Sequence, residues 1–314
     1  MIATIFRLFF SMLASSALLK AAASRIGIRG RRSPARRFVA GETHDEAIAA
    51  VEAIEARGLT VTIDRLGEQV TSSAAALEAA RAYVDLIGEA TPGRVSRGLS
   101  VKLTQIGLDV DRATAIDNLR RVVEAAVEPG IFVRVDMEGA TYTDDTLDTV
   151  ETLWSIGYRN VGVAIQAALR RSGDDIRRLN ALGMSVRLVK GAYRESRRIA
   201  FVRADDVDAE FRRLTELLLT EGHRPAIATH DPDLIAHARQ VATARAIALD
   251  QFEFEFLYGL RRDLQTSLAR DGYAVRVYVP YGREWFPYFM RRLGERPANI
   301  WFVVKNLFAE RPDA

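Results

Sequence analysis

From residue 59 onward, short apolar runs rich in β-branched residues alternate with longer stretches in which apolar residues recur at helical spacing. This repeated strand and helix order predicts a parallel sheet, because parallel neighbours need a crossover connection that is usually a helix. Eight such runs in a domain of about 250 residues favour a (β/α)8 barrel over the alternative, a doubly wound open sheet. No G-x-G-x-x-G follows any run, so a Rossmann dinucleotide site is unsupported. The predicted strands are Leu59–Asp64, Leu99–Leu103, Phe132–Met137, Val161–Gln166, Val186–Lys190, Ala226–His230, Ala246–Phe254 and Ala274–Pro280.

The first forty residues break this pattern. Met1 to Leu19 is apolar and a run of alanines follows it, so a cleaved signal peptide is one interpretation. Arg7 interrupts the run, no charged segment precedes it, and it is too short to cross a bilayer, which favours an amphipathic helix. Arg25 to Arg37 carries six arginines in thirteen positions and suits either contact with phosphate or anionic lipid, or a solvated arm. We predict a helical and basic arm over residues 1–40 and one domain over residues 41–314.

Composition narrows the function classes. The 314 residues include 44 lysines and arginines against 41 aspartates and glutamates, which gives a net charge of +3. A protein that binds nucleic acid over its whole surface is therefore not indicated. The absence of cysteine excludes thiolate catalysis, iron–sulfur clusters and cysteine zinc sites. Only four of the cations are lysines: Lys20, Lys102, Lys190 and Lys305.

Polar residues lie at or near the ends of most predicted strands, where barrels of this type carry their chemistry. Two lysines and an arginine against one acid suit an anionic substrate or cofactor. A lone aspartate cannot perform glycosidase chemistry with two carboxylates, and prolines prevent the three spaced histidines from sharing one helix, so no metal site is predicted. The strand-end candidates are Lys102, Asp136, Gln166, Arg187, Lys190, Thr229, His230 and Tyr278.

The C-terminal segment adds a second constellation. If the segment after Pro287 is helical, Tyr288, Arg291 and Arg292 lie on one face. Two adjacent guanidiniums can hold a carboxylate through paired hydrogen bonds. The tyrosines at 278 and 288, with Leu257, would wall a pocket for an aliphatic ring, whereas the alternative is an ordinary solvated helix face.

Several blocks in this order resemble bacterial monofunctional proline dehydrogenase. They are Arg187–Tyr193 (RLVKGAY), Ala228–His230 (ATH), Phe252–Leu257 (FEFEFL) and Arg276–Gly282 (RVYVPYG) with Arg291–Glu295 (RRLGE). Thr60–Asp64, Leu66–Glu68, Ser100–Thr104 and Arg134–Met137 extend the likeness over nearly the whole domain. The resemblance implies a distorted (β/α)8 barrel of the TIM type, FAD bound non-covalently at the strand ends, and a final helix over the barrel mouth.

The resemblance also implies roles for individual residues. Lys102, Arg291 and Arg292 would hold the carboxylate of L-proline, while Tyr278, Tyr288 and Leu257 would pack against its ring. Asp136 and Arg187 match catalytic positions, Arg187 beside the reactive N5 of the flavin, and Glu68 matches a glutamate that pairs with Arg291 as a gate. The positions that match flavin contacts are Met137, Gln166, Lys190, Gly191, Ala192, Thr229 and His230.

The implied reaction is hydride transfer from proline C5 to the flavin, giving Δ1-pyrroline-5-carboxylate, the first step of proline degradation to glutamate. Electrons would pass to a membrane quinone, from a cytoplasmic enzyme that either stays in solution or contacts the inner face of the membrane. The proton acceptor and the oligomeric state stay open. The alternatives are a hydroxyproline dehydrogenase and a Schiff-base aldolase that uses Lys102 or Lys190. A nucleic-acid binder acting through residues 25–37 is disfavoured.

Overall fold

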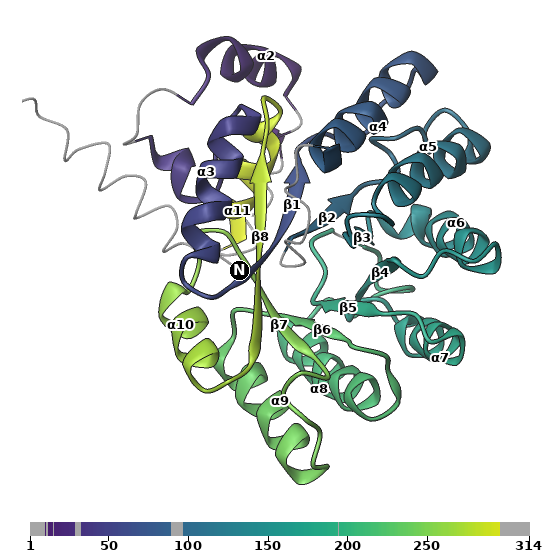
Figure 1. Cartoon of the computed structure of the whole chain (residues 1–314), viewed down its shortest axis with the longest axis vertical. Coiled ribbons are helices and arrows are strands. Elements are labelled where there is room, and N and C mark those ends of the chain that lie inside the picture. The colour runs from purple at the N-terminus through teal and green to yellow at the C-terminus, as the bar shows by residue number, and fades with distance from the viewer. Residues whose placement is uncertain are drawn as a thin grey trace, which may run out of the picture.

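Eight parallel strands form a closed barrel in which each strand lies next to its neighbours in sequence (Figure 1). The computed structural model describes residues 10, 12–14, 16–28, 33–88, 97–193 and 195–295. The barrel closes where Thr60 to Arg65 pair with Arg276 to Tyr281. The predicted barrel is thus confirmed, and the open sheet was the wrong alternative. The strands are β1 (Thr60–Arg65), β2 (Arg97–Val101), β3 (Phe132–Val135), β4 (Val161–Gln166), β5 (Val186–Val189), β6 (Ala226–Ala228), β7 (Glu253–Leu257) and β8 (Ala274–Tyr281).

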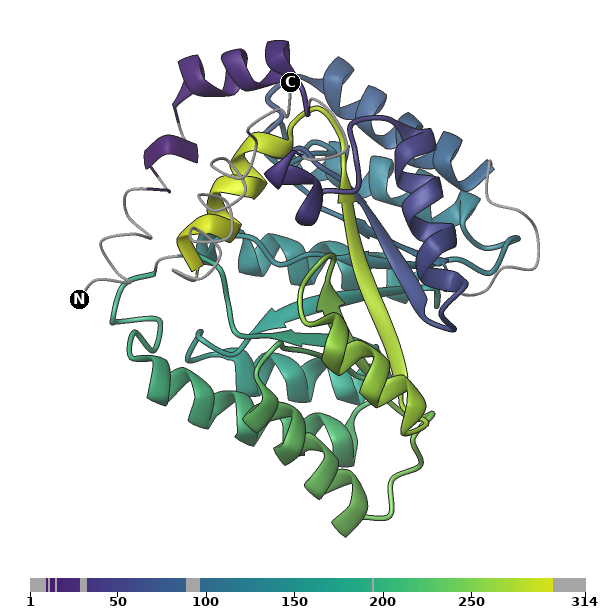
Figure 2. The same cartoon turned by 90° about the vertical axis from the view of Figure 1, so that its left-hand side faces the viewer.

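Helices surround the barrel (Figure 1). Helix α3 (His44–Glu55) precedes β1 and packs on the outside of β1 and β8, where the helix after β8 would otherwise lie. Helix α11 (Trp285–Glu295) instead packs against α2 (Ala17–Ile26), as Figure 2 shows. The other helices are α4 (Ser73–Gly88), α5 (Arg112–Ala125), α6 (Thr143–Ser155), α7 (Ser172–Leu182), α8 (Ala204–Glu221), α9 (Pro232–Ala244) and α10 (Arg262–Arg270), with 3-10 turns η1 (Pro34–Arg37) and η2 (Ala140–Tyr142).

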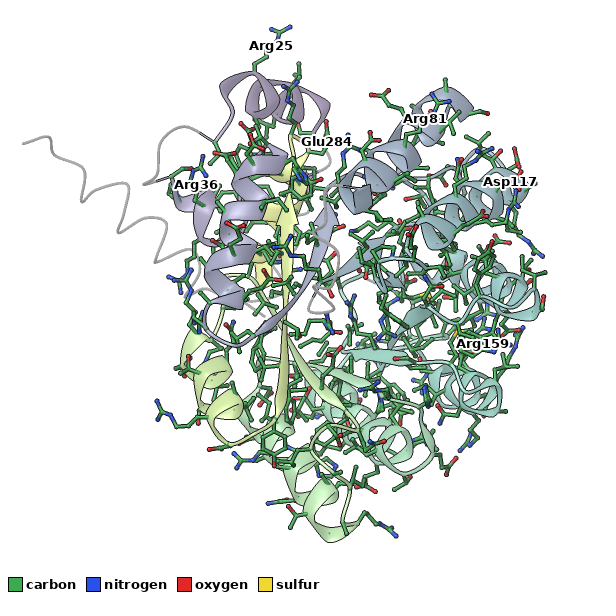
Figure 3. All side chains as sticks on the ribbon, viewed as in Figure 1. Arg25, Arg36, Arg81, Asp117, Arg159 and Glu284 are labelled. Carbon is green, nitrogen blue, oxygen red and sulfur yellow. The ribbon has the colours of Figure 1, made fainter. Side chains whose placement is uncertain are left out.

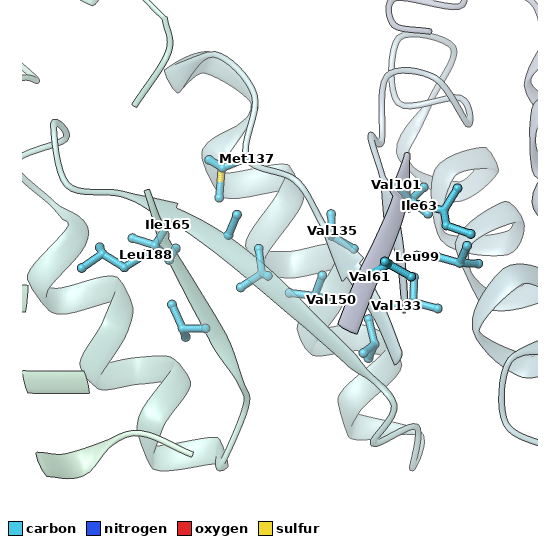
Figure 4. Close-up of a cluster of buried hydrophobic side chains, with 14 of the residues drawn as sticks. Val61, Ile63, Leu99, Val101, Val133, Val135, Met137, Val150, Ile165 and Leu188 are labelled. Atoms are coloured by element: carbon cyan, nitrogen blue, oxygen red, sulfur yellow. The ribbon is translucent and has the colours of Figure 1, made fainter. Parts of the chain in front are cut away.

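Alternate residues of each strand face opposite sides of the barrel wall. The outward set packs against the helices and forms the main apolar cluster, which includes Val61, Leu99, Val133 and Leu188 (Figure 4). The inward set combines small residues with charged ones, and the charged side chains bond to one another across the barrel. Charged side chains of both signs also cover the periphery of the molecule (Figure 3).

A glycine makes room for charge inside the barrel. A Cβ at Gly162 on β4 would lie 2.4 Å from the carbonyl oxygen of Ser185 and 2.7 Å from a guanidinium nitrogen of Arg134. Arg134 uses the space to donate to that carbonyl at 2.6 Å and to the Ser185 hydroxyl at 3.1 Å. A side chain at position 162 would therefore displace either the strand or the arginine.

The prediction for the seventh strand was wrong in its position. The structure places β7 at Glu253–Leu257, whereas the predicted run began at Ala246. Ala246 has a φ of +52°, and its N–H donates to the carbonyl of Thr243, so the chain turns there after α9. The run 246–249 is apolar without alternation, while the true strand alternates phenylalanine with glutamate and turns its acids inward.

The final helix also begins earlier than predicted. Helix α11 starts at Trp285, so Pro287 lies in its first turn. Proline is tolerated there because the first N–H groups of a helix have no intrahelical acceptor.

The N-terminal arm packs with α11 in a second apolar cluster, called here the cover cluster. Its members are buried where the arm and the chain after it pack against α11. Phe38 is fully buried there, and its ring centroid lies 6.1 Å from that of Phe289. Arm residues 1–9, 11, 15 and 29–32, which include Arg7 and three of the six arginines, lie outside the described residues, as does Lys305. The cover cluster consists of Phe10, Ala14, Ala23, Ile28, Ala35, Phe38, Val39, Leu66, Trp285, Tyr288, Phe289, Met290 and Leu293.

Candidate active site

Lys102 is the centre of a polar network at the carboxyl ends of β1, β2, β3 and β8, called here the floor of the site. Its ammonium donates to Asp64 at 3.0 Å, to Asp136 at 3.4 Å and to the hydroxyl of Tyr278 at 3.3 Å. Burial alone would lower the pKa of Lys102, but the charges of these neighbours raise it well above its ordinary value. Lys102 is therefore a charged group that already has an acceptor for each of its three N–H donors.

Asp136 is the carboxylate on which this network converges. It accepts from Ser100 Oγ at 2.7 Å, from Arg187 Nη1 at 2.8 Å and from the Tyr278 hydroxyl at 2.8 Å. Burial alone would raise the pKa of Asp136, but the charges of Lys102 and Arg187 lower it below its usual value. The Asp136 carboxylate is therefore compensated by the cations and hydroxyl groups of the floor.

Arg187 links the floor to the barrel interior. Its Nη1 donates to Ser100 Oγ at 3.0 Å as well as to Asp136, and its Nε lies 2.6 Å from Glu255 Oε2. The guanidinium carbon lies 5.4 Å from the ring centroid of Tyr278. Within the described part of the chain, the buried Nη2 has no hydrogen-bond partner. The two N–H groups of Nη2 are thus buried donors without a hydrogen-bond acceptor among the described residues.

The cover of the site consists of Glu68, in the β1–α4 connection, and the polar residues of α11. Arg291 donates to the two carboxylate oxygens of Glu68 at 2.9 and 3.1 Å. Arg292 is buried, with its guanidinium carbon 5.1 Å from the ring centroid of Tyr288. The predicted helix face therefore brings both arginines and Tyr288 together, and the predicted pairing of Glu68 with Arg291 is present.

Tyr193, in the loop after β5, lies close enough to the floor and the cover to be affected by both. Although Tyr193 is 36% exposed, partial desolvation and the charge of Glu138 raise its pKa to about 12, while Arg291 and Lys102 oppose this shift. Tyr193 is thus within electrostatic reach of both Arg291 on α11 and Lys102 in the floor. Leu257 ends β7, and Tyr278 lies on β8 beside it in the strand register.

The residues predicted to contact a flavin lie mainly at the ends of β4, β5 and β6. Gln166 Nε2 donates to the carbonyl of Glu138 at 2.8 Å, which fixes its amide. Gly191 has a φ of +115°, and a Cβ there would lie 3.2 Å from Gln166 Oε1 and from the Ala168 methyl. Met137 instead packs in the main apolar cluster.

The remaining flavin candidates line the rim. His230 Nε2 accepts the backbone N–H of Leu257 at 3.0 Å, so this ring nitrogen carries no proton. Thr229 Oγ1 accepts the N–H of Asp231 at 3.2 Å, and Lys190 forms ion pairs with Asp208 at 2.5 Å and Asp231 at 3.2 Å. Ala192 is exposed beside Gly191.

Sequence reasoning missed several members of the site. Asp64 ends the first predicted strand, so the rule that selected the other strand ends would have found it. Ser100 is two residues before Lys102 and shares its face, and Glu255 alternates with the phenylalanines of β7. Glu138 accepts from the backbone N–H and hydroxyl of Thr104 at 3.1 and 2.6 Å, and no pattern in the sequence marks this contact.

Neither a metal site nor a membrane-spanning helix is present among the described residues. No group of three or more histidine, aspartate or glutamate side chains is arranged to hold a metal ion. No described helix is both long enough and apolar enough to span a bilayer.

Solved structures of proline utilization A proteins share this fold. One from Bdellovibrio bacteriovorus, inactivated by N-propargylglycine, superposes with a TM-score of 0.78 at 24% identity and covers 92% of this chain. A variant from Bradyrhizobium japonicum gives a TM-score of 0.72 at 26% identity over 90% of this chain. The matches cover 36% and 32% of those longer proteins, so the chain spans about a third of their length.

Curated relatives match over most of their own length. Proline dehydrogenase 1 of Bacillus subtilis strain 168 is 41% identical over 278 residues, which cover 88% of this chain and 92% of that protein. Proline dehydrogenase of Deinococcus radiodurans is 41% identical over 277 residues, covering 87% and 89%. The family model described as proline dehydrogenase matches residues 47–305. The resemblance inferred from the sequence is confirmed, and the chain belongs to the proline dehydrogenase family of oxidoreductases.

Proposed function

We propose that this chain oxidises L-proline to Δ1-pyrroline-5-carboxylate with FAD as its cofactor, as the first step of proline degradation to glutamate. The observation that carries the proposal is the pair of arginines on α11, one bonded to Glu68 and the other buried, at the mouth of a barrel whose floor holds a charged lysine. This arrangement suits a small substrate with one carboxylate and an apolar ring.

The strand ends fit a flavin in their chemistry. Arg187 keeps a buried N–H donor without a partner, which suits the hydrogen-bond acceptors of a flavin ring. At Gly191 a side chain would press on Gln166 and Ala168, so the backbone there stays open to close approach. The cofactor would be held non-covalently by Arg187, Gln166, Lys190, Gly191, Ala192, Thr229 and His230. Met137, which lies two residues after β3 and packs in the main apolar cluster, would contact it from there. Bound FAD supplies the hydride acceptor.

The chain's own residues bind the substrate, orient it and favour the neutral form of its amine. Arg291 and Arg292 hold the carboxylate with paired hydrogen bonds, and Tyr288, Tyr278 and Leu257 position the ring. The amine must be neutral before hydride can leave, and the nearby cations favour the neutral amine over the ammonium by like-charge repulsion. Lys102 adds a fixed positive charge that attracts the carboxylate and disfavours the ammonium form of the amine.

The same fixed charge disfavours the aldolase alternative. A Schiff-base lysine needs a neutral amine as nucleophile, which requires a lowered pKa. The pKa of Lys102 is raised instead, and each of its N–H donors has an acceptor.

Electrons would leave the reduced cofactor to a membrane quinone, with the protein at the inner face of the cytoplasmic membrane. Support comes from the arm, where Met12 is 72% exposed and Leu18 is 84% exposed. Exposed apolar side chains on a helix can enter a lipid interface. Cosedimentation with vesicles that contain anionic lipid tests this contact, and loss of binding in the variant Leu18→Glu is the expected result.

Anaerobic addition of L-proline to the FAD-loaded protein is the decisive experiment. We expect the flavin absorbance to bleach and the product to react with o-aminobenzaldehyde. Absence of bleaching would contradict the proposal, and bleaching by hydroxyproline alone would reassign the substrate. A colourless protein trapped by borohydride with a carbonyl compound would restore the aldolase.

A further inference from the structure

Glu255 and Arg187 form an ion pair inside the barrel, beneath the floor. The Nε of Arg187 lies 2.6 Å from Oε2 of Glu255, and the two side chains are 4% and 3% exposed. They come from β5 and β7, and their strands are separated only by β6. Two charges removed this far from water interact strongly, and loss of either partner leaves the other uncompensated.

Arg187 is the cation that forms an ion pair with Glu255. The other charged groups that face Glu255 are Arg134 on β3, Arg276 on β8 and Glu253 on β7. Arg276 Nε donates to both oxygens of Glu253 at 2.9 Å, and Arg134 donates to the backbone and hydroxyl of Ser185. Within the described residues, no N–H group donates to Oε1 of Glu255, and the carboxyl that lies against Glu255 is that of Glu253 on the same strand.

Arg187 therefore divides one positive charge between two carboxylates. Asp136 lies on its mouth side at 2.8 Å from Nη1, and Glu255 lies on its interior side at 2.6 Å from Nε. The proposed function places the same guanidinium beside the flavin. Charge next to the ring system tunes a flavin, because two-electron reduction adds negative charge that a nearby cation stabilises.

We propose that Glu255 is a positioning and tuning residue for the flavin: it fixes the guanidinium of Arg187 from below and offsets its charge, which lowers the flavin reduction potential. The inference rests on the proposed binding of FAD. Glu255, which is buried inside the barrel, would thereby control how readily electrons enter and leave the cofactor.

The variant Glu255→Gln tests this directly, since it keeps the side-chain volume and removes the charge. We expect the equilibrium constant for two-electron reduction of the bound flavin to rise about tenfold, a potential shift of about +30 mV. Equilibration with a reference dye during slow anaerobic reduction measures the potential without substrate turnover. The matched control is Glu253→Gln, which removes an equal charge two residues nearer the amino end of β7, and its shift should stay under about threefold.

A second variant separates the effect of charge from the effect of packing, and it still tests the inference if Glu255→Gln folds poorly. Glu255→Asp keeps the carboxylate, so its potential should stay within about threefold of the wild type. Three results would overturn the inference: equal potential shifts in the two glutamine variants, no shift in Glu255→Gln with FAD bound, or a tenfold shift in Glu255→Asp. A wild-type protein that binds no FAD would contradict the proposed function instead, so the two failures are distinguishable.

The pH dependence gives an independent check on the wild-type protein. Burial, with the charge of Glu253, raises the pKa of Glu255, while Arg187, Arg134 and Arg276 oppose the shift. As the pH falls through this raised pKa, the carboxyl becomes neutral and the wild type should approach Glu255→Gln in potential. A gap between the two proteins that stays constant down to their acid unfolding would contradict the charge assignment.

Discussion

The floor of the site is held by the barrel itself, whereas the cover is held by apolar side chains outside the barrel. Lys102, Asp136 and Arg187 follow or belong to strands whose register is fixed by backbone hydrogen bonds, and they are bonded to one another. Arg291 and Arg292 stand on α11, which the cover cluster packs against the arm. The floor resists movement because displacing one charge uncovers others, whereas the cover is held mainly by apolar packing.

This difference separates two functions within one site. In the proposed reaction, the floor would set the charge at the reacting centre. In the proposed reaction, the cover would admit and release the substrate, and the partly exposed ion pair of Glu68 and Arg291 suits that task. The following variants test whether the two regions can be damaged independently.

The largest effect is expected for Lys102→Met in the floor. It leaves Asp64 and Asp136 facing each other without their shared cation, and a broken buried ion pair costs about 3–5 kcal/mol of stability. Urea unfolding at neutral pH measures this loss. The double variant Lys102→Met with Asp64→Asn should recover part of it, and fully additive losses would show that the two residues do not interact.

Arg292→Met in the cover comes next. Hydrogen bonds to charged groups contribute about 1.5–3 kcal/mol each, so the proline KM should rise on the order of a hundredfold. Bound FAD and the urea midpoint should change little, because the floor is untouched. Arg283→Met, at an exposed position in the turn before α11, is the matched control. Loss of FAD from the Arg292 variant would mean that cover and floor are not separable.

Trp285→Phe tests the support of the cover. Trp285 Nε1 donates to Glu42 Oε1 at 2.8 Å, and this bond joins α11 to the chain that follows the arm. Its loss, about 1 kcal/mol, should raise the proline KM about fivefold with kcat nearly unchanged. Trp154→Phe on α6, which packs on the outside of the barrel, controls for loss of an indole. A fall in kcat at constant KM would place the effect in the chemistry instead.

Glu68→Gln should have the smallest effect. Its pair with Arg291 is partly exposed, with side-chain exposures of 21% and 26%, so it contributes at most about 1 kcal/mol. The proline KM should change less than fivefold. Because of this ion pair, the KM of the wild type, but not that of the variant, should depend on salt concentration. A change beyond tenfold would assign Glu68 a direct contact with the substrate.

The floor was more predictable from sequence than the cover. Strand-end residues such as Lys102 and Asp136 follow from the alternation of each run, since parallel strands of a barrel end on one rim. The same rule was applied incompletely, because it would also have selected Asp64. The failure at β7 has a local cause: the run 246–249 is apolar but lies in a mostly exposed turn, and tertiary context decided that its neighbour at 253–257 pairs with β8.

The cover depended on contacts between distant segments. Adjacency of Arg291 and Arg292 on one helix is local, and the sequence predicted it. That α3 occupies the outer position beside β8, leaving α11 to pack with the arm, could not be inferred from the periodicity of either helix.

The sequence by itself determined the barrel, the rim of strand-end polar residues and the paired arginines, because each depends on spacing within one element. Only the tertiary structure decided which charges neighbour one another. Whether Glu255 faces Arg187 or solvent depends on barrel closure and on the register of β5, β6 and β7, and both are fixed by long-range pairing. The electrostatics of the site follow from that closure, since charge interactions depend on distance and burial, and neither is a property of one segment.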